Sequence, residues 1–151
     1  MGDIVRRARP AEARGLSALA LRSKAWWGYD AAFLERVRPS LAVESTDVRR
    51  HPIYVLEREG RTLGFYGLRI LDGEPWLYDL WVDPPDIGSG AGRTLWNHLT
   101  QTARELGYAY FLIESDPNAE GFYLHAGARR IGETTSPDSG RRLPLLRYDL
   151  A

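Results

Sequence analysis

The sequence predicts an α/β (α+β) fold, a single domain over residues 1–151 with a mixed, mostly antiparallel central sheet flanked by helices. Three observations support this prediction. Residues 53–82 contain strongly β-forming runs separated by tight turns. A glycine-rich loop at 88–92 leads into an amphipathic helical pattern. The nearly continuous apolar run at 108–114 is typical of a strand buried on both faces.

The first third of the chain predicts one strand and two short helices. Residues 3–9 alternate weakly and stop at Pro10, as suits a strand. From position 11 toward 26, apolar residues recur at helical spacing. Asp30 is a good N-cap for a second helix, which we expect Pro39 to end.

The middle of the chain predicts an antiparallel meander. Its three strands are expected at 53–58, 62–71 and 76–82. Glycine turns around Gly60 and Gly73 separate them, because these positions favour tight hairpin connections.

Five further elements are expected in the last third. A helix with Leu95, Leu99 and Ala103 on one face follows the glycines and ends at Gly107. The others are a strand at 108–114, a helix at 118–125, and strands at 128–133 and 143–150. A polar loop at 134–142 separates the last two strands, and such loops often shape substrate sites.

Composition excludes several classes of function. Twenty basic residues balance twenty acidic ones, so no bulk charge favours nucleic acid or a membrane surface. The chain has no cysteine, which rules out disulfides, thiolate metal sites and covalent catalysis through sulfur. No signal segment or membrane span is evident, which predicts a cytoplasmic protein.

The most informative stretch is residues 80–95, where a strand passes through glycines into a helix. Glycines allow a close backbone approach, and the free amides of a helix's first turn attract an anion, so the loop predicts phosphate binding. A plain strand-to-helix turn is the alternative. A dinucleotide fold is disfavoured because Arg93 takes the position of the third glycine, and a nucleotide-hydrolase loop because lysine is missing before Thr94.

Val82, Pro84 and Gly88-Ser89-Gly90-Ala91-Gly92 resemble the acetyl-CoA loop of the GNAT N-acetyltransferase family. Ile87 stands where that family usually has Arg or Gln, which predicts weaker cofactor affinity. The resemblance implies that acetyl-CoA, the acetyl donor, contacts residues before, within and after the loop: Leu80, Trp81, Val82, Ile87, Gly88, Ser89, Gly90, Ala91, Gly92, Arg93, Thr94, Asn118 and Tyr123.

A second stretch, residues 114–128, is similar to the closing motif of the same family, with Asn118 followed by the pair Phe122-Tyr123. Both motifs lie in the family's order, so the chain resembles one GNAT domain over 1–151. Residues 22–30 and 140–144 also look like those of a bacterial GNAT subgroup. In the family a tyrosine protonates the thiolate and an asparagine bonds the pantetheine or its channel, roles that fall on Tyr123 and Asn118. The alternative is that the Tyr123 ring only packs against its neighbours and has no catalytic role.

The resemblance leaves the general base open. Asp79 and Glu114 lie on the two strands expected to flank the cleft, so either is a candidate to accept the amine proton. Trp26, Trp27 and Tyr29 follow the first helix, where the family commonly forms the acceptor wall. The chain's three histidines, His51, His98 and His125, lack the spacing of metal ligands, so no metal is assigned. His98 is expected on the exposed side of its helix.

The predicted function is transfer of the acetyl group of acetyl-CoA to a primary amine by direct attack in a ternary complex. A non-catalytic acyl-CoA-binding module or sensor is the first alternative, and an unrelated nucleotide-binding domain is the second. The expected partner is a small-molecule or protein amine acceptor, with no nucleic acid and no membrane. A monomer and a homodimer both stay open, since the strand at 143–150 offers an edge for pairing.

Overall fold

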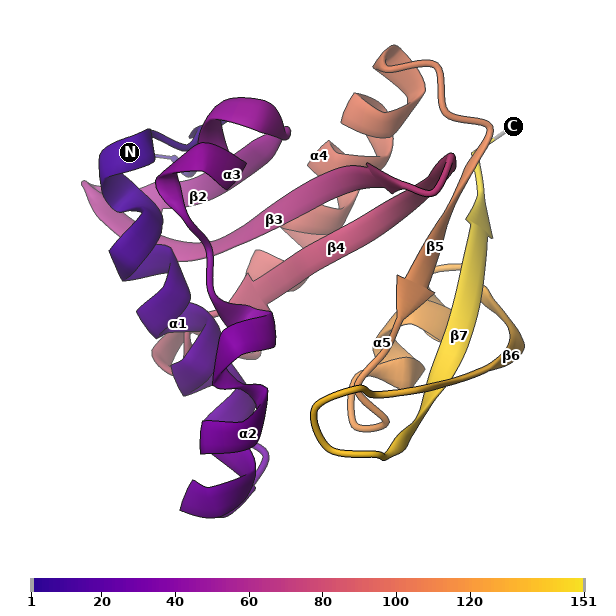
Figure 1. Ribbon diagram of the computed structural model, residues 1–151. Helices are drawn as coiled ribbons and strands as arrows, with labels where there is room; N and C mark the ends of the chain where they lie inside the picture. The colour runs from indigo at the N-terminus through magenta and orange to yellow at the C-terminus, as the bar shows by residue number, and fades with distance from the viewer. Residues whose placement is uncertain (1, 151) are drawn as a thin grey trace.

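A seven-stranded sheet forms the centre of the computed structural model, which describes residues 2–150 (Figure 1). Its spatial order is β1-β2-β3-β4-β5-β7-β6. Neighbouring strands are antiparallel except for β4 and β5, which are parallel, so the predicted fold class is confirmed. The strands are β1 (Ile4–Arg7), β2 (Ile53–Arg58), β3 (Arg61–Leu71), β4 (Glu74–Val82), β5 (Tyr110–Glu114), β6 (Arg129–Thr135) and β7 (Arg142–Asp149).

The helices are α1 (Ala13–Ala25), α2 (Ala31–Leu41), α3 (Ser45–Arg50), α4 (Ala91–Glu105) and α5 (Glu120–His125), with short 3₁₀ turns at Pro10–Glu12 and Pro84–Asp86. The Asp30 side chain accepts a hydrogen bond from the Phe33 amide at 2.8 Å, which confirms the predicted N-cap of α2. Pro39 lies inside the last turn of α2 instead of ending it. Helix α3 was not predicted, because its six residues are mostly polar and bury only Val48.

Two hydrophobic cores hold the helices against the sheet. One lies under α4 and α5 and centres on Leu95, Leu99 and Phe111. The other lies under α1 and α3, where Leu16, Leu19 and other apolar residues of α1 meet the opposite face of β2 and β3. Figure 1 shows α1 and α2 on one side of the strands and α4 on the other. The helical spacing in the sequence therefore predicted the buried faces correctly.

The two hairpins of the meander use the predicted glycine turns. Glu59 and Gly60 have φ angles of 50° and 79°, and Asp72 and Gly73 have 51° and 78°. Successive positive φ values in a two-residue loop match the twist of antiparallel strands.

The expected exposed edge at the C-terminal strand is wrong. Strand β7 lies between β5 and β6, so its backbone is paired on both sides, and the edges of the sheet are β1 and β6. The order of strands depends on tertiary pairing that local patterns do not report. Across residues 2–150, no helix has the length and apolar character that crossing a bilayer requires.

Candidate active site

The site is organised around a gap between β4 and β5. These strands pair only at Trp76 and Leu112, and beyond this point they diverge, as Figure 1 shows at one end of the sheet. Asp83 donates its amide to the Leu63 carbonyl at 2.8 Å, on the β3 side. Because backbone direction alternates along an antiparallel pair, the amides of Leu80 and Val82 point into the gap, without a strand partner.

A bulge in β4 places Asp79 on the face of the sheet opposite α4. Gly67 pairs with Asp79 and Leu68 with Leu77, so Tyr78 is the extra residue. The shift leaves Leu77 in the core under α4 while Asp79 lies on the opposite face. A Cβ at Gly67 would lie 3.2 Å from Asp79 Oδ2, so glycine gives this carboxylate its space.

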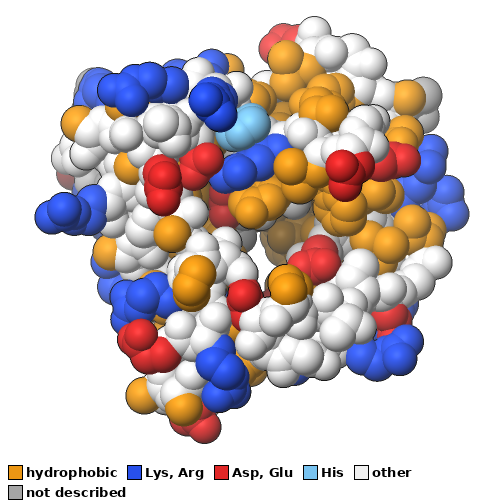
Figure 2. Space-filling view, in the orientation of Figure 1, with side chains coloured by type: hydrophobic (Ala, Val, Ile, Leu, Met, Phe, Trp, Pro, Cys, Tyr) orange, Lys and Arg blue, Asp and Glu red, His pale blue; other side chains and the backbone are white. Residues whose placement is uncertain are grey.

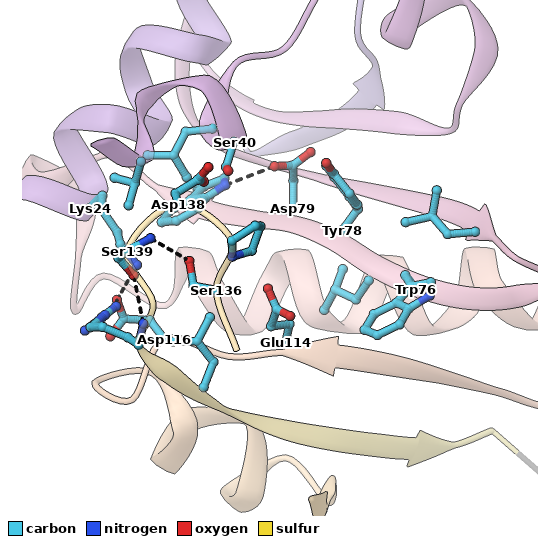
Figure 3. Close-up of a pocket in the computed structure, with 18 residues that line it drawn as sticks. Lys24, Ser40, Trp76, Tyr78, Asp79, Glu114, Asp116, Ser136, Asp138 and Ser139 are labelled. Carbon is cyan, nitrogen blue, oxygen red and sulfur yellow. Dashed lines mark hydrogen bonds and ion pairs between the residues drawn. The ribbon is translucent and has the colours of Figure 1, made fainter. Parts of the chain in front are cut away.

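Two cavities meet at the gap. The glycine-loop cavity has a volume of about 450 Å³ and is lined by residues of β4, the glycine loop, the segment after β5 and α5. The acidic cavity, about 370 Å³, lies beside it between β4, α2 and the loop after β6 (Figure 3). Five residues line both: Leu77, Tyr78, Trp81, Glu114 and Asp116. Figure 2 shows a hollow near the centre of this face, with hydrophobic and acidic side chains at its rim.

The glycine loop presents free backbone donors to its cavity. Gly88 and Gly90 have φ angles of 86° and 91°, which side-chain-bearing residues rarely adopt. Thr94 is the first residue of α4 to donate its amide along the helix, to the Gly90 carbonyl at 3.0 Å. The amides of Gly88 and of residues 90–93 donate to no backbone acceptor in the described chain, so this helix N-terminus can bind an anion.

Most of the predicted loop residues line this cavity, and three do not. Ile87, Gly88, Gly90, Gly92 and Arg93 line it, together with Leu80, Trp81 and Val82. The Ser89 hydroxyl donates a hydrogen bond to the Asp86 carbonyl at the start of the loop, and the Ala91 side chain packs into the core. Thr94 donates its hydroxyl to Gly90. These three residues therefore add no side chain to the cavity wall.

Tyr123 lines the glycine-loop cavity from α5 and is 8% exposed. Burial raises its pKa, and the charges of Asp79 and Asp116 raise it further. The phenol therefore stays protonated at neutral pH. No group within residues 2–150 hydrogen-bonds its hydroxyl, which leaves the proton available to a ligand.

Asp79 lines the acidic cavity and is 5% exposed. Burial raises the pKa of Asp79 to about 6, against the opposing effect of a hydrogen bond from Trp81 Nε1 to Oδ1 at 3.2 Å. Its Oδ2 is buried without a hydrogen-bond partner in the described chain. An unsatisfied carboxylate oxygen of this kind is costly and favours a functional role.

Glu114, the other predicted base candidate, comes from β5 and lines both cavities. Its Oε2 accepts a hydrogen bond from the Thr134 hydroxyl at 2.6 Å, and its side chain is exposed. Figure 3 shows Glu114 and Asp79 on opposite sides of the gap. Burial thus distinguishes the two carboxylates.

A polar cluster around the buried Lys24 ammonium joins the elements beside the cavities. Lys24 of α1 pairs with Asp116 at 2.5 Å, and Asp116 also accepts a hydrogen bond from the Tyr29 hydroxyl at 2.9 Å. Asn118 and Arg141 each donate to the Tyr29 hydroxyl, at 3.0 and 2.9 Å. Burial acts to raise the pKa of Asp116, but the Lys24 hydrogen bond and charge, with the other donors, lower it below the ordinary value.

The predicted aromatic wall is dispersed in the structure. Trp26 is 50% exposed and lines neither cavity, although its ring contacts Trp27 edge-on at 4.9 Å between centroids. Trp27 lines the glycine-loop cavity instead of the acidic one. Tyr29 lines neither and acts through the polar cluster.

Sequence reasoning assigned no role to several residues of the acidic cavity, among them Lys24, Trp76, Tyr78, Asp116, Asp138 and Arg141. Lys24 was detectable, since it falls at helical spacing on the apolar face of α1 with Leu16 and Ala20. A lysine in that stripe needs a buried partner. The others come together only through tertiary structure.

The histidines show one departure from expectation. His98 is half-buried, and its Nδ1 lies 2.7 Å from the Tyr66 hydroxyl, so its predicted place on the exposed side of α4 is wrong. Among residues 2–150, no three His, Cys, Asp or Glu side chains gather in a way that could hold a metal ion.

Solved structures share this architecture over nearly the whole chain. The PaiA N-acetyltransferase from Thermoplasma acidophilum, solved with coenzyme A, matches with a TM-score of 0.80 and 16% identity, covering 99% of each chain. The ribosomal-protein-S18-alanine N-acetyltransferase from Escherichia coli matches with a TM-score of 0.72 and 16% identity, covering 99% of this chain and 95% of that one.

N-acetylglutamate synthase from Neisseria gonorrhoeae, complexed with coenzyme A and N-acetyl-glutamate, matches with a TM-score of 0.73 and 19% identity. That match covers all of this chain, 100%, and 36% of the other. Identities this low establish a common fold. A comparison with curated proteins finds no match.

The family assignment comes from the sequence itself. The sequence model of the Acetyltransferase (GNAT) family matches residues 18–128, which include the second part of α1, the meander, the glycine loop, α4, β5 and α5. This confirms the predicted family, its enzyme class and the acetyl donor of that class, acetyl-CoA. The chain belongs to the GNAT acetyltransferase family.

Proposed function

We propose that residues 1–151 act as one N-acetyltransferase domain, which transfers the acetyl group of acetyl-CoA to a primary amine by direct attack in a ternary complex. One observation carries this proposal: two cavities with different linings meet at the β4–β5 gap and share five residues. Such an arrangement lets a donor and an acceptor enter from different sides and react at the junction.

The glycine-loop cavity is the proposed donor site. Free amides at Gly88 and residues 90–93 suit the pyrophosphate, and Arg93 adds a charged donor at the same helix end. The unpaired amides of Leu80 and Val82 suit the polar groups of the pantetheine arm and acetyl carbonyl. Ile87 lines the cavity without a polar group, which supports the expectation of reduced affinity.

The acidic cavity is the proposed acceptor site, and Asp79 is the proposed base. This carboxylate takes a proton from the incoming amine directly or through water, and its Oδ2 has no hydrogen-bond partner in the described chain to compete for that proton. Glu114 stands at the junction, where it can hold the amine through one oxygen while Thr134 binds the other. Burial and hydrogen bonding thus favour Asp79 over Glu114 as the base.

Bound acetyl-CoA supplies the activated acetyl thioester. In the proposed reaction a C–N bond forms to the acceptor and the C–S bond breaks. The amine proton passes to Asp79, and the Tyr123 hydroxyl gives a proton to the departing sulfur. A phenol suits this role, since its unperturbed pKa of about 10 lies near that of a thiol at about 8.5. The Leu80 and Val82 amides are placed to stabilise developing negative charge on the carbonyl oxygen.

Release of the coenzyme A thiol is the direct test. The chain has no cysteine, so a thiol-reactive dye reports the product without a protein background. We expect amine-dependent thiol release from acetyl-CoA across a panel of primary amines, together with an acetylated amine detected by mass spectrometry. Binding of acetyl-CoA without turnover on any amine would favour the non-catalytic acyl-CoA module instead.

A further inference from the structure

We propose that the acidic cavity selects acceptors that carry a second cationic group besides the reacting amine, that is, diamines in preference to amino acids or simple alkylamines. This inference rests on the proposed function, because it names the acceptor class of the same site. Its basis is the distribution of paired and unpaired charges in the cavity wall.

Carboxylates outnumber basic groups in this wall. Asp79, Glu114, Asp116 and Asp138 line the cavity, against Lys24 and Arg141. Both basic groups belong to the polar cluster around Asp116, with Lys24 at 2.5 Å and Arg141 at 3.7 Å from the same oxygen. Three carboxylates therefore remain to meet an acceptor.

The two basic side chains of the wall are both directed at Asp116. Lys24 is buried, and its ammonium is bound to Asp116. Arg141 donates to the Tyr29 hydroxyl at 2.9 Å, lies over the Phe33 ring at 4.7 Å and faces Asp116 at 3.7 Å, while its buried Nε has no hydrogen-bond partner in the described chain. An amino acid acceptor would bring its carboxylate among Asp79, Glu114 and Asp138, where the two cations of the wall already face Asp116.

The remaining carboxylates come from three different elements and share the cavity wall with apolar side chains. Asp79 comes from β4, Glu114 from β5 on the opposite side of the gap, and Asp138 from the loop after β6, near Ser40 of α2 (Figure 3). Asp138 is half-buried and has neither a hydrogen bond nor an ion pair through its side chain in the described part of the chain. Trp76, Leu71 and Leu41 line the same space. An ammonium at Asp79, an aliphatic chain and a second ammonium at Asp138 match this lining.

Three acceptors of equal chain length test the inference: putrescine, n-butylamine and γ-aminobutyrate. They differ in carrying an ammonium, a methyl or a carboxylate at the far end. At saturating acetyl-CoA, we expect kcat/KM for putrescine to exceed that for n-butylamine about tenfold, as about 1.4 kcal/mol of added interaction gives. γ-Aminobutyrate should be the poorest of the three.

Asp138→Asn removes the proposed second contact and should lower the ratio of putrescine to n-butylamine turnover several-fold. Glu35→Gln is the matched control, because it removes one negative charge from an exposed ion pair on α2. That variant should keep the ratio. Equal turnover of the three acceptors, preference for γ-aminobutyrate, or an unchanged ratio in Asp138→Asn would overturn the inference.

Calorimetric titration of putrescine into the free protein tests the cavity apart from acetyl transfer. We expect binding that weakens in Asp138→Asn, weakens with added salt, and is retained in Glu35→Gln. Absence of putrescine binding together with normal acetyl-CoA binding would refute the acceptor class alone. Absence of acetyl-CoA binding would instead refute the proposed function, whether or not putrescine binds.

Discussion

Asp79 lines the acidic cavity and Tyr123 the glycine-loop cavity, and burial raises the pKa of both. The consequences differ with the chemistry of each group. A carboxyl with a pKa of about 6 is ionised at neutral pH and can accept a proton, whereas a phenol with a raised pKa stays protonated and can donate one. The same physical cause thus provides a base in one cavity and an acid in the other.

Replacing Tyr123 by Phe tests the acid. The ring fills the same space, so the fold and the affinity for acetyl-CoA should be retained, while the proton donor is lost. We expect kcat to fall about 100-fold, within the usual range for general acid catalysis. Thiol-release kinetics and calorimetry measure the two properties separately. Unchanged kcat would remove Tyr123 from the acid role.

Asp79→Asn tests the base through activity and through stability. In the wild type, kcat/KM should rise as the pH passes about 6, where Asp79 loses its proton. Arg69 and Asp47, the charged groups that act on Asp79, have opposite and smaller effects on its pKa. The variant should lose most of its activity, together with this limb of the pH profile.

The free energy of unfolding should fall over the same pH range in which activity rises. Between the ordinary pKa of 3.8 and about 6, native Asp79 holds a proton that the unfolded chain has lost, so stability falls as pH rises through this window. The ionised, buried carboxylate then costs about 3 kcal/mol at neutral pH, at about 1.4 kcal/mol per pKa unit. We expect Asp79→Asn to raise the free energy of unfolding toward this amount near pH 7, and to gain little below the ordinary pKa. A variant less stable than wild type in urea at neutral pH contradicts the assignment.

At the scale of elements, the glycine loop and α4 form one anion-binding unit. Gly90 has a φ of 91° and open space around it, so a side chain there meets backbone strain and no clash. The loop was predicted from the sequence because glycine spacing reports backbone conformation directly. Helix α4 was predicted from another local signal, the helical period of its apolar residues.

Gly90→Val should weaken acetyl-CoA binding at least tenfold, because a β-branched residue shifts the loop away from positive φ and moves the amides. Gly15→Ala is the control. Gly15 lies inside α1 with open space around it, and alanine there should raise helix stability by up to about 1 kcal/mol without affecting the ligand. Calorimetry on both variants makes the comparison, and equal acetyl-CoA affinity would refute the loop assignment.

The polar cluster fixes α1 to the segment after β5. Lys24→Met leaves Asp116 buried without its closest cation, and we expect a loss of about 3 kcal/mol in the free energy of unfolding. Lys24→Met combined with Asp116→Asn should recover part of this loss, since the charge is then removed. Urea unfolding of wild type, single and double variants measures the effect. A fully stable single variant would show that the pair contributes little.

At the scale of the whole molecule, local patterns predicted nearly every element, but not how the strands are arranged. The meander, both glycine turns and β5 followed from residue type and period, but the expected burial of β5 on both faces is wrong, since only Phe111 and Ile113 on one face are buried. The insertion of β7 beside β5 did not, because pairing between distant segments leaves no local trace. Helix α3 was missed for want of an apolar period.

The candidate site shows the same division. Tyr123, Asp79 and the glycine loop were identified through motifs or strand position. The acidic cavity was not identified, since Lys24, Asp116, Asp138 and Arg141 converge from α1, the segment after β5 and the loop after β6. A buried lysine on an apolar helix face was the one signal in the sequence.

Isothermal titration with acetyl-CoA, with ATP and NAD as controls, tests the central claim most directly. We predict saturable binding of acetyl-CoA to one site per chain, with no comparable heat from either control. Failure to bind acetyl-CoA, or binding of ATP in its place, would contradict the assignment of the glycine-loop cavity as the acetyl-donor site.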